Sequence, residues 1–130
     1  MATLKDLEKY IGYEFSSGPY TGEDYKSFEK KYINYLRSMC NANGWELVKV
    51  SKNHYEFTAF IKNRDNRYIY FSISDVRFFG NEWYSHILYR TAKHDKDYTG
   101  GINCYTTLPK LAIALTNMFD RETIALKKNI

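Results

Sequence analysis

Residues 67–74 have the sequence RYIYFSIS, in which two kinds of side chain alternate one for one. Ile69, Phe71 and Ile73 fall on one side of this run, and tyrosines and serines fall on the other. A period of two indicates a β-strand, because successive side chains point to opposite faces of a sheet. We therefore predict a strand here, with one side facing a core and a second side rich in tyrosine.

Similar runs precede and follow this strand, separated by segments with turn chemistry. We predict further strands over residues 45–51, 55–62 and 83–92, with turns at 52–54 and 63–66 and an irregular connection at 75–82. Short connections favour antiparallel neighbours. Residues 45–92 are therefore predicted to form a four-stranded antiparallel meander.

Helical periodicity lies on both sides of the predicted sheet. Residues 21–44 carry the strongest apolar stripe and end at Asn43-Gly44, a helix stop, while residues 107–120 carry a second stripe that begins beside Pro109. Residues 1–20 are predicted to form a short helix and a loop. The order predicts one α+β domain of two layers, with the two main helices side by side on one sheet face.

Length and composition bound the class of protein. A chain of 130 residues makes one domain, and its 19 basic and 15 acidic residues give a net charge of +4, too positive for an acidic mimic of DNA. Cys40 and Cys104 lie far apart and form no CxxC, which favours reduced thiols. With no leader or apolar span in the sequence, we expect a cytoplasmic protein that does not bind membranes.

The second side of the sheet is the first candidate site. Pleating is expected to send Tyr68 and Tyr70 outward, with Arg90 beside them on the fourth strand. Aromatic rings among cations suit single-stranded nucleic acid, since bases stack on rings and cations hold phosphates. The alternative is that the tyrosines serve packing alone, because tyrosine is a common strand residue.

A basic rim at one end of the sheet is the second candidate. Arg64 and Arg67 flank the turn at 63–66, and Lys93 and Lys96 follow the last predicted strand, so the four are expected to gather where phosphate groups could contact them. The alternative is that these charges only keep the turns soluble and protect sheet edges.

The densest polar cluster is Lys93-His94-Asp95-Lys96-Asp97, before Gly100-Gly101. His94 with two nearby carboxylates suggests metal binding or acid–base chemistry, whereas a charged run between elements is usually a solvated loop. We place His94 among the binding residues, and we predict no catalytic residue, metal or cofactor.

Four stretches carry a resemblance: GWELV at 44–48, NHY at 53–55, YFSISDVR at 70–77 and RTAKHDKDYTGG at 90–101. They resemble small uncharacterised proteins of bacterial mobile genetic elements. In size and style, such a stand-alone domain is similar to anti-CRISPR proteins. The resemblance implies an inhibitor that docks on a nucleoprotein effector, and it assigns no residue a role.

Three hypotheses of function follow from these observations. The first is a non-enzymatic binding or inhibitor protein whose partner is a protein or ribonucleoprotein effector complex. The second is an accessory protein that binds nucleic acid directly through the aromatic and basic face. The third is a small metal-dependent enzyme built around His94, Asp95 and Asp97.

Overall fold

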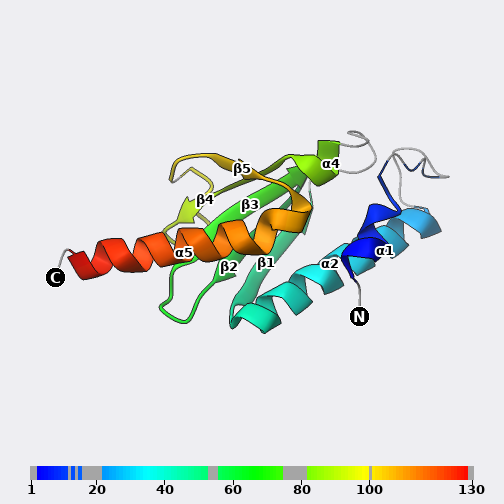
Figure 1. Ribbon diagram of the computed structural model, residues 1–130. Helices are drawn as coiled ribbons and strands as arrows, with labels where there is room; N and C mark the ends of the chain where they lie inside the picture. Colours follow the sequence, from blue (N-terminus) through cyan, green and yellow to red (C-terminus); the bar gives the residue numbers. More distant parts are fainter. Residues whose placement is uncertain are drawn as a thin grey trace.

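Five strands form one sheet in the order β1-β2-β3-β4-β5, each antiparallel to the next. The computed structural model describes residues 3–11, 13, 15, 22–52, 56–74, 82–99 and 101–128. The described elements, in chain order, are α1 (Leu4–Glu8), α2 (Glu23–Asn43), β1 (Glu46–Lys52), β2 (Glu56–Lys62), β3 (Tyr68–Ser74), α4 (Glu82–Ser85), β4 (Ile87–Ala92), β5 (Cys104–Thr106), the 3-10 turn η1 (Leu108–Lys110) and α5 (Leu111–Lys128) (Figure 1).

The predicted α+β class and element order are confirmed, but the sheet has a fifth strand. β5 lies inside the predicted loop at 93–106 and pairs with β4 from Ile87↔Thr106 to Tyr89↔Cys104. Three residues are too few to show an alternating pattern, which is why the sequence did not predict this strand. It forms because β4 offers a free edge with which it can pair.

The predicted start of the fourth strand at Trp83 is wrong. Residues 82–85 form one helical turn, α4, and the pairing of β4 with β3 begins at Ile73↔Ile87. Tyr84 from this turn donates its hydroxyl hydrogen to Glu8 Oε1 at 3.1 Å. This long-range contact with α1 is not visible in the local sequence period. His54 and the predicted connection at 75–81 lie outside the described residues.

Helix α2 ends where Asn43-Gly44 predicts. Gly44 has a φ of 73°, and the Trp45 amide donates to the Cys40 carbonyl at 2.8 Å, which closes a Schellman motif. The positive φ favours glycine here, and a Cβ would lie 2.8 Å from a guanidinium nitrogen of the flexible, exposed Arg64 side chain, which would have to shift. The motif turns the chain directly from α2 into β1.

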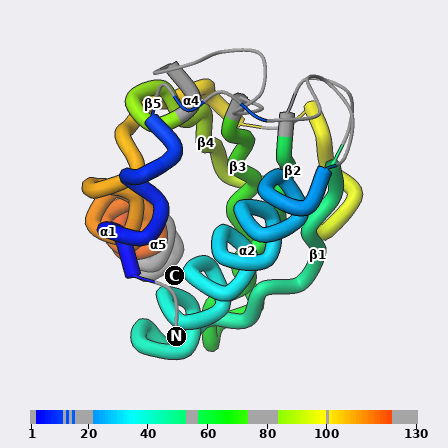
Figure 2. Tube along the Cα trace, turned by 90° about the vertical axis from the view of Figure 1, so that its right-hand side faces the viewer, coloured from blue at the N-terminus to red at the C-terminus, as the bar shows by residue number. Residues whose placement is uncertain are grey.

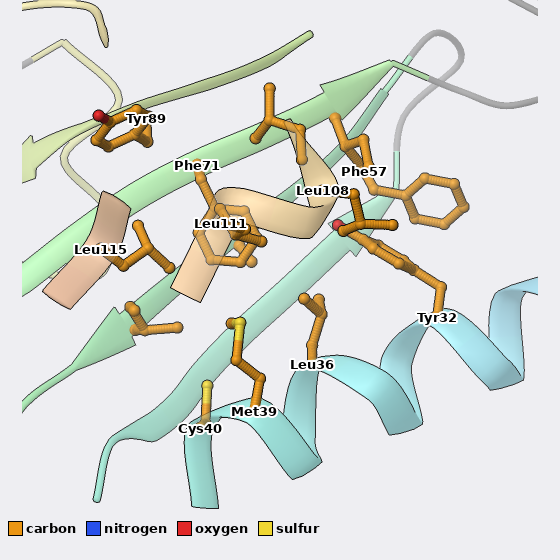
Figure 3. Packing of buried hydrophobic residues seen from close by; sticks show 14 of the residues in the cluster. Tyr32, Leu36, Met39, Cys40, Phe57, Phe71, Tyr89, Leu108, Leu111 and Leu115 are labelled. Atoms are coloured by element: carbon orange, nitrogen blue, oxygen red, sulfur yellow. The ribbon is translucent and has the colours of Figure 1, made fainter. Parts of the chain in front are cut away.

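Helices α2 and α5 pack on the same face of the sheet, as predicted. Figure 2 shows both helices on one side of the strands, and Figure 3 shows their side chains meeting those of the sheet. Leu36 of α2, Leu115 of α5 and Phe71 of β3 all lie in one apolar cluster and are at most 1% exposed. The core therefore lies between the helices and one sheet face.

The two cysteines differ in their surroundings. Both are free thiols; Cys40 on α2 is buried in the core, and Cys104 on β5 is half-buried. Burial disfavours the thiolate and raises the pKa of Cys40 to about 12. Cys40 therefore contributes to the fold as a small apolar group. Among the described residues, no helix combines the length and the apolar character needed to span a bilayer.

Leu115→Ala should lower the free energy of unfolding by about 2–5 kcal/mol, because it leaves a cavity in the core between α5 and the sheet. Ile113→Ala on the same helix is the matched control, since Ile113 is 65% exposed, and it should change stability by less than about 0.5 kcal/mol. Urea denaturation measures both. If both variants lose the same free energy of unfolding, the assignment of Leu115 to the buried face of α5 and of Ile113 to its exposed face is contradicted.

Candidate binding site on the second sheet face

A row of side chains crosses the sheet face opposite the helices. Lys49 pairs with Phe60, Phe60 with Tyr70, and Tyr70 with Arg90, and directly opposed residues of antiparallel strands share a face. Ser72 and Leu88 form the next row on the same face. We call this surface the second face.

The second face is covered by the connection between β4 and β5, described over residues 93–99 and 101–103, and is not open as predicted. Figure 2 shows this yellow segment on the side of the strands away from the helices. The Tyr98 ring packs edge-on against Phe60 at 5.2 Å and against Tyr70 at 5.8 Å, and Lys49 Nζ donates to the Tyr98 hydroxyl at 3.2 Å. The cover spans the strands from β4 to β1.

The predicted exposure of Tyr70 and Arg90 is therefore wrong. Tyr70 is 7% and Arg90 6% exposed, whereas Tyr68 is half-buried. Stripping the cover from the sheet would expose the apolar Phe60 and Tyr70 rings to water, so the connection closes over them. Above Phe60 and Tyr70, the covering connection presents Tyr98 outward, and this side chain is 45% exposed.

Arg90 has an unusual environment for a cation. Its guanidinium carbon lies 4.2 Å from the centre of the Tyr70 ring, and Nη2 donates to the Tyr98 carbonyl. Nη1 is buried and has no hydrogen-bond partner among the described residues, and no described carboxylate forms an ion pair with Arg90.

Energetics distinguish this arrangement from an ordinary structural arginine. Burying a charge costs several kcal/mol. A cation–π contact returns about 2 kcal/mol and a charge-assisted hydrogen bond about 1.5–3 kcal/mol. One nitrogen without an acceptor adds about 1–3 kcal/mol of unmet desolvation cost. The described protein groups therefore do not fully offset the cost of burying the Arg90 guanidinium, because one of its nitrogens lacks an acceptor among them.

A hollow of about 470 Å³ lies beside Arg90, and we call it the Arg90 hollow. Tyr70 and Arg90 line it from the sheet, and Tyr98 from the covering connection. Three further polar side chains also line it: Ser72, Thr99 and Asn103. Arg90 thus lines a concave surface together with residues that carry hydroxyl and amide groups.

A second hollow of about 270 Å³ lies next to the first, and we call it the Arg67–Lys93 hollow. Gly101 lines both hollows. Its φ is 74°, and a Cβ there would lie 2.7 Å from the Thr91 carbonyl oxygen, so only glycine lets the connection approach β4 this closely. Gly101 therefore holds the two hollows side by side.

The predicted basic rim is assembled only in part. Arg67 and Lys93 line the same hollow, but Arg64 lines a different one beside Gly44 and Trp45, near the end of α2. Lys96 is exposed in the turn that follows β4. The predicted grouping of all four cations is wrong for Arg64, because the turn between β2 and β3 directs Arg64 and Arg67 to different surfaces.

The cluster around His94 orders its own turn. Asp97 accepts the Lys93 amide through Oδ2 at 2.9 Å and the Thr99 amide through Oδ1 at 3.2 Å. His94 Nδ1 accepts the Lys96 amide at 3.1 Å. These bonds position the start of the covering connection. Across the described ranges of the chain, no three His, Cys, Asp or Glu side chains are placed to hold a metal ion.

Sequence reasoning missed several residues that form the site. Tyr98, Thr99 and Asn103 lie in a polar loop, and Ser72 and Lys49 looked like ordinary strand residues. The available signal was the aromatic Tyr98 just before Gly100-Gly101, since a tyrosine ring carries a large apolar area that is favourable to bury. In comparisons with known proteins, no family model, curated protein or solved structure matches this chain.

Tyr98→Ala should lower the free energy of unfolding by about 1–2 kcal/mol, because it removes two edge-on ring contacts. Tyr98→Phe is the matched control, since it keeps the ring and loses only the exposed hydrogen bond from Lys49, and should cost less than about 1 kcal/mol. Chemical denaturation gives both values. If the two variants are equally stable, the ring does not seal the second face.

Proposed function

We propose that this protein is a non-enzymatic binding protein that docks on a nucleoprotein through its second face, and that the nucleic-acid component supplies the main contacts. The observation that carries the proposal is the buried Arg90 guanidinium with its unpartnered Nη1, beside a second cationic hollow. Uncompensated cations in hollows favour a partner that brings negative charge.

The free cations near the covering connection favour a polyanion. Arg67 and Lys93 form no ion pair with a described residue, and the carboxylate of Asp97 beside them already accepts two backbone amides. Lys62 differs, because it donates to Glu46 at 3.2 Å, which raises the pKa of its ammonium group. Two adjacent hollows suit successive phosphate groups of one strand.

Exposed aromatic side chains on the same side favour a single strand. Tyr98 is 45% and Tyr105 is 54% exposed, and Tyr105 lies opposite Leu88 on the second face, with its ring stacked on His86 at 4.6 Å. Bases stack on such rings for about 1–3 kcal/mol each. The proposed aromatic platform therefore consists of Tyr98 on the cover and Tyr105 on β5, in place of Tyr68 and Tyr70.

A protein component of the nucleoprotein has a contact surface beside these rings. Ile102 is 84% exposed and lies in the covering connection, two residues before the edge strand β5 begins at Cys104. Apolar and tyrosine side chains are frequent anchors of protein interfaces. The inhibitor form of the proposal, in which the nucleoprotein is a CRISPR effector, is supported by the likeness in size and style to anti-CRISPR proteins.

Direct binding should be measured with labelled single-stranded RNA and DNA over a series of salt concentrations. We expect affinity to fall steeply with salt, and the double variant Arg67→Gln/Lys93→Gln to reduce the slope of log K against log salt by about 1.4, because two phosphate contacts are lost. Arg121→Gln/Lys110→Gln changes net charge equally at exposed positions on α5 and η1, and should leave the slope unchanged.

Two results would contradict the proposal. One is the absence of binding to either nucleic acid at low salt. The other is an equal reduction, in both double variants, of the slope of log K against log salt, because that would mean that binding depends on net charge alone. Capture of an effector complex by the wild-type protein, lost in Arg67→Gln/Lys93→Gln, would support the inhibitor form.

A further inference from the structure

We propose that the Arg90 hollow is a built site for the phosphate group of one nucleotide, held by the Arg90 guanidinium and the polar side chains around it. The choice of phosphate rests on the proposed function, since a nucleic-acid partner brings that group. The site itself is argued from the geometry of the hollow: a cation 94% buried lines a concave surface, with one nitrogen that no described residue satisfies.

The guanidinium is held in place before any ligand arrives. The Tyr70 ring lies against one side of it, 4.2 Å from the guanidinium carbon, and Nη2 is engaged by the Tyr98 carbonyl. A side chain fixed in this way loses little freedom when its remaining nitrogen binds an oxygen. Arg90 therefore has the properties of a preorganised anion anchor.

The lining of the hollow suits a group with several oxygens. Ser72 and Thr99 contribute hydroxyls, and Asn103 contributes an amide that can donate two hydrogen bonds. A phosphate offers more acceptor oxygens than a carboxylate, so it can engage Arg90 and these groups together. Leu88 adds an apolar patch to the lining.

The size of the hollow suits more than a bare ion. Its volume of about 470 Å³ falls within the range of small-molecule sites, about 300–1,000 Å³. The exposed edge of the Tyr98 ring borders the hollow and offers a surface for a sugar or base. A nucleotide unit, free or within a strand, therefore fits the chemistry of the walls.

The test is titration of the intact protein by NMR and calorimetry with three phosphate probes: inorganic phosphate, adenosine 5′-monophosphate and a short single-stranded oligonucleotide. Acetate serves as the carboxylate probe. Arg90→Lys keeps the charge but removes Nη1 and the planar fork, with Arg121→Gln as the control at an exposed arginine. Asn103→Asp places a negative charge at an exposed position lining the hollow, and Asn117→Asp makes the same change on the exposed surface of α5.

We expect adenosine 5′-monophosphate to bind the wild type and both controls, with shifts at Ser72, Thr99 and Asn103. Affinity should fall at least tenfold in Arg90→Lys and Asn103→Asp. Asn103→Asp keeps the test valid even where Arg90→Lys fails to fold. Binding of the mononucleotide identifies a free nucleotide as a source of the phosphate, and binding of the oligonucleotide alone at these residues identifies the strand.

Three results would overturn the inference. They are no phosphate probe binding at the hollow, acetate binding there as tightly as phosphate, and equal affinities in Asn103→Asp and Asn117→Asp. The proposed function would stand if no probe binds at the hollow but the oligonucleotide still binds elsewhere on the protein. That binding would have to depend on salt and weaken in Arg67→Gln/Lys93→Gln. Mononucleotide binding without oligonucleotide binding would support the site and contradict the proposed function.

Discussion

The contact of Arg90 with Tyr70 and Tyr98 determines the second face of this protein. The guanidinium lies over the Tyr70 ring and donates to the Tyr98 carbonyl, so one strand residue ties the covering connection to the sheet. The Tyr98 ring then closes over Phe60. Without this tie, two apolar rings of the sheet would face water, and neither of the adjoining hollows would have its outer wall.

The same contact leaves the Arg90 guanidinium buried, at a cost in desolvation free energy. One nitrogen of Arg90 is buried without an acceptor from the described residues, so the desolvation cost of that nitrogen is not offset by a hydrogen bond to them. A ligand that supplies negative charge would relieve this cost and also strengthen the hold on the connection. If the proposed phosphate binds, its binding and the order of the connection would be thermodynamically linked, because each favours the same state of Arg90.

The helix side of the sheet and the second face differ in how far the sequence predicts them. Ile69, Phe71 and Ile73 were assigned to the core from their alternation alone, and all are at most 2% exposed. Tyr70 lies between them in sequence and follows the same rule of alternation, yet its burial depends on Tyr98, 28 positions further along the chain. Periodicity predicts which face a residue lies on, but it does not predict what covers that face.

The sequence by itself determined the α+β class, the period-two runs that became β1 to β4, the stop of α2 at Gly44 and the packing of α2 and α5 on one sheet face. These features follow from local spacing and backbone preference, which act over a few residues. Tertiary structure alone decided the edge strand β5, the separation of Arg64 from Arg67 and the hollow at Arg90. Each depends on where distant strands place the ends of a loop, and a buried donor without an acceptor can be recognised only once all its neighbours are in position.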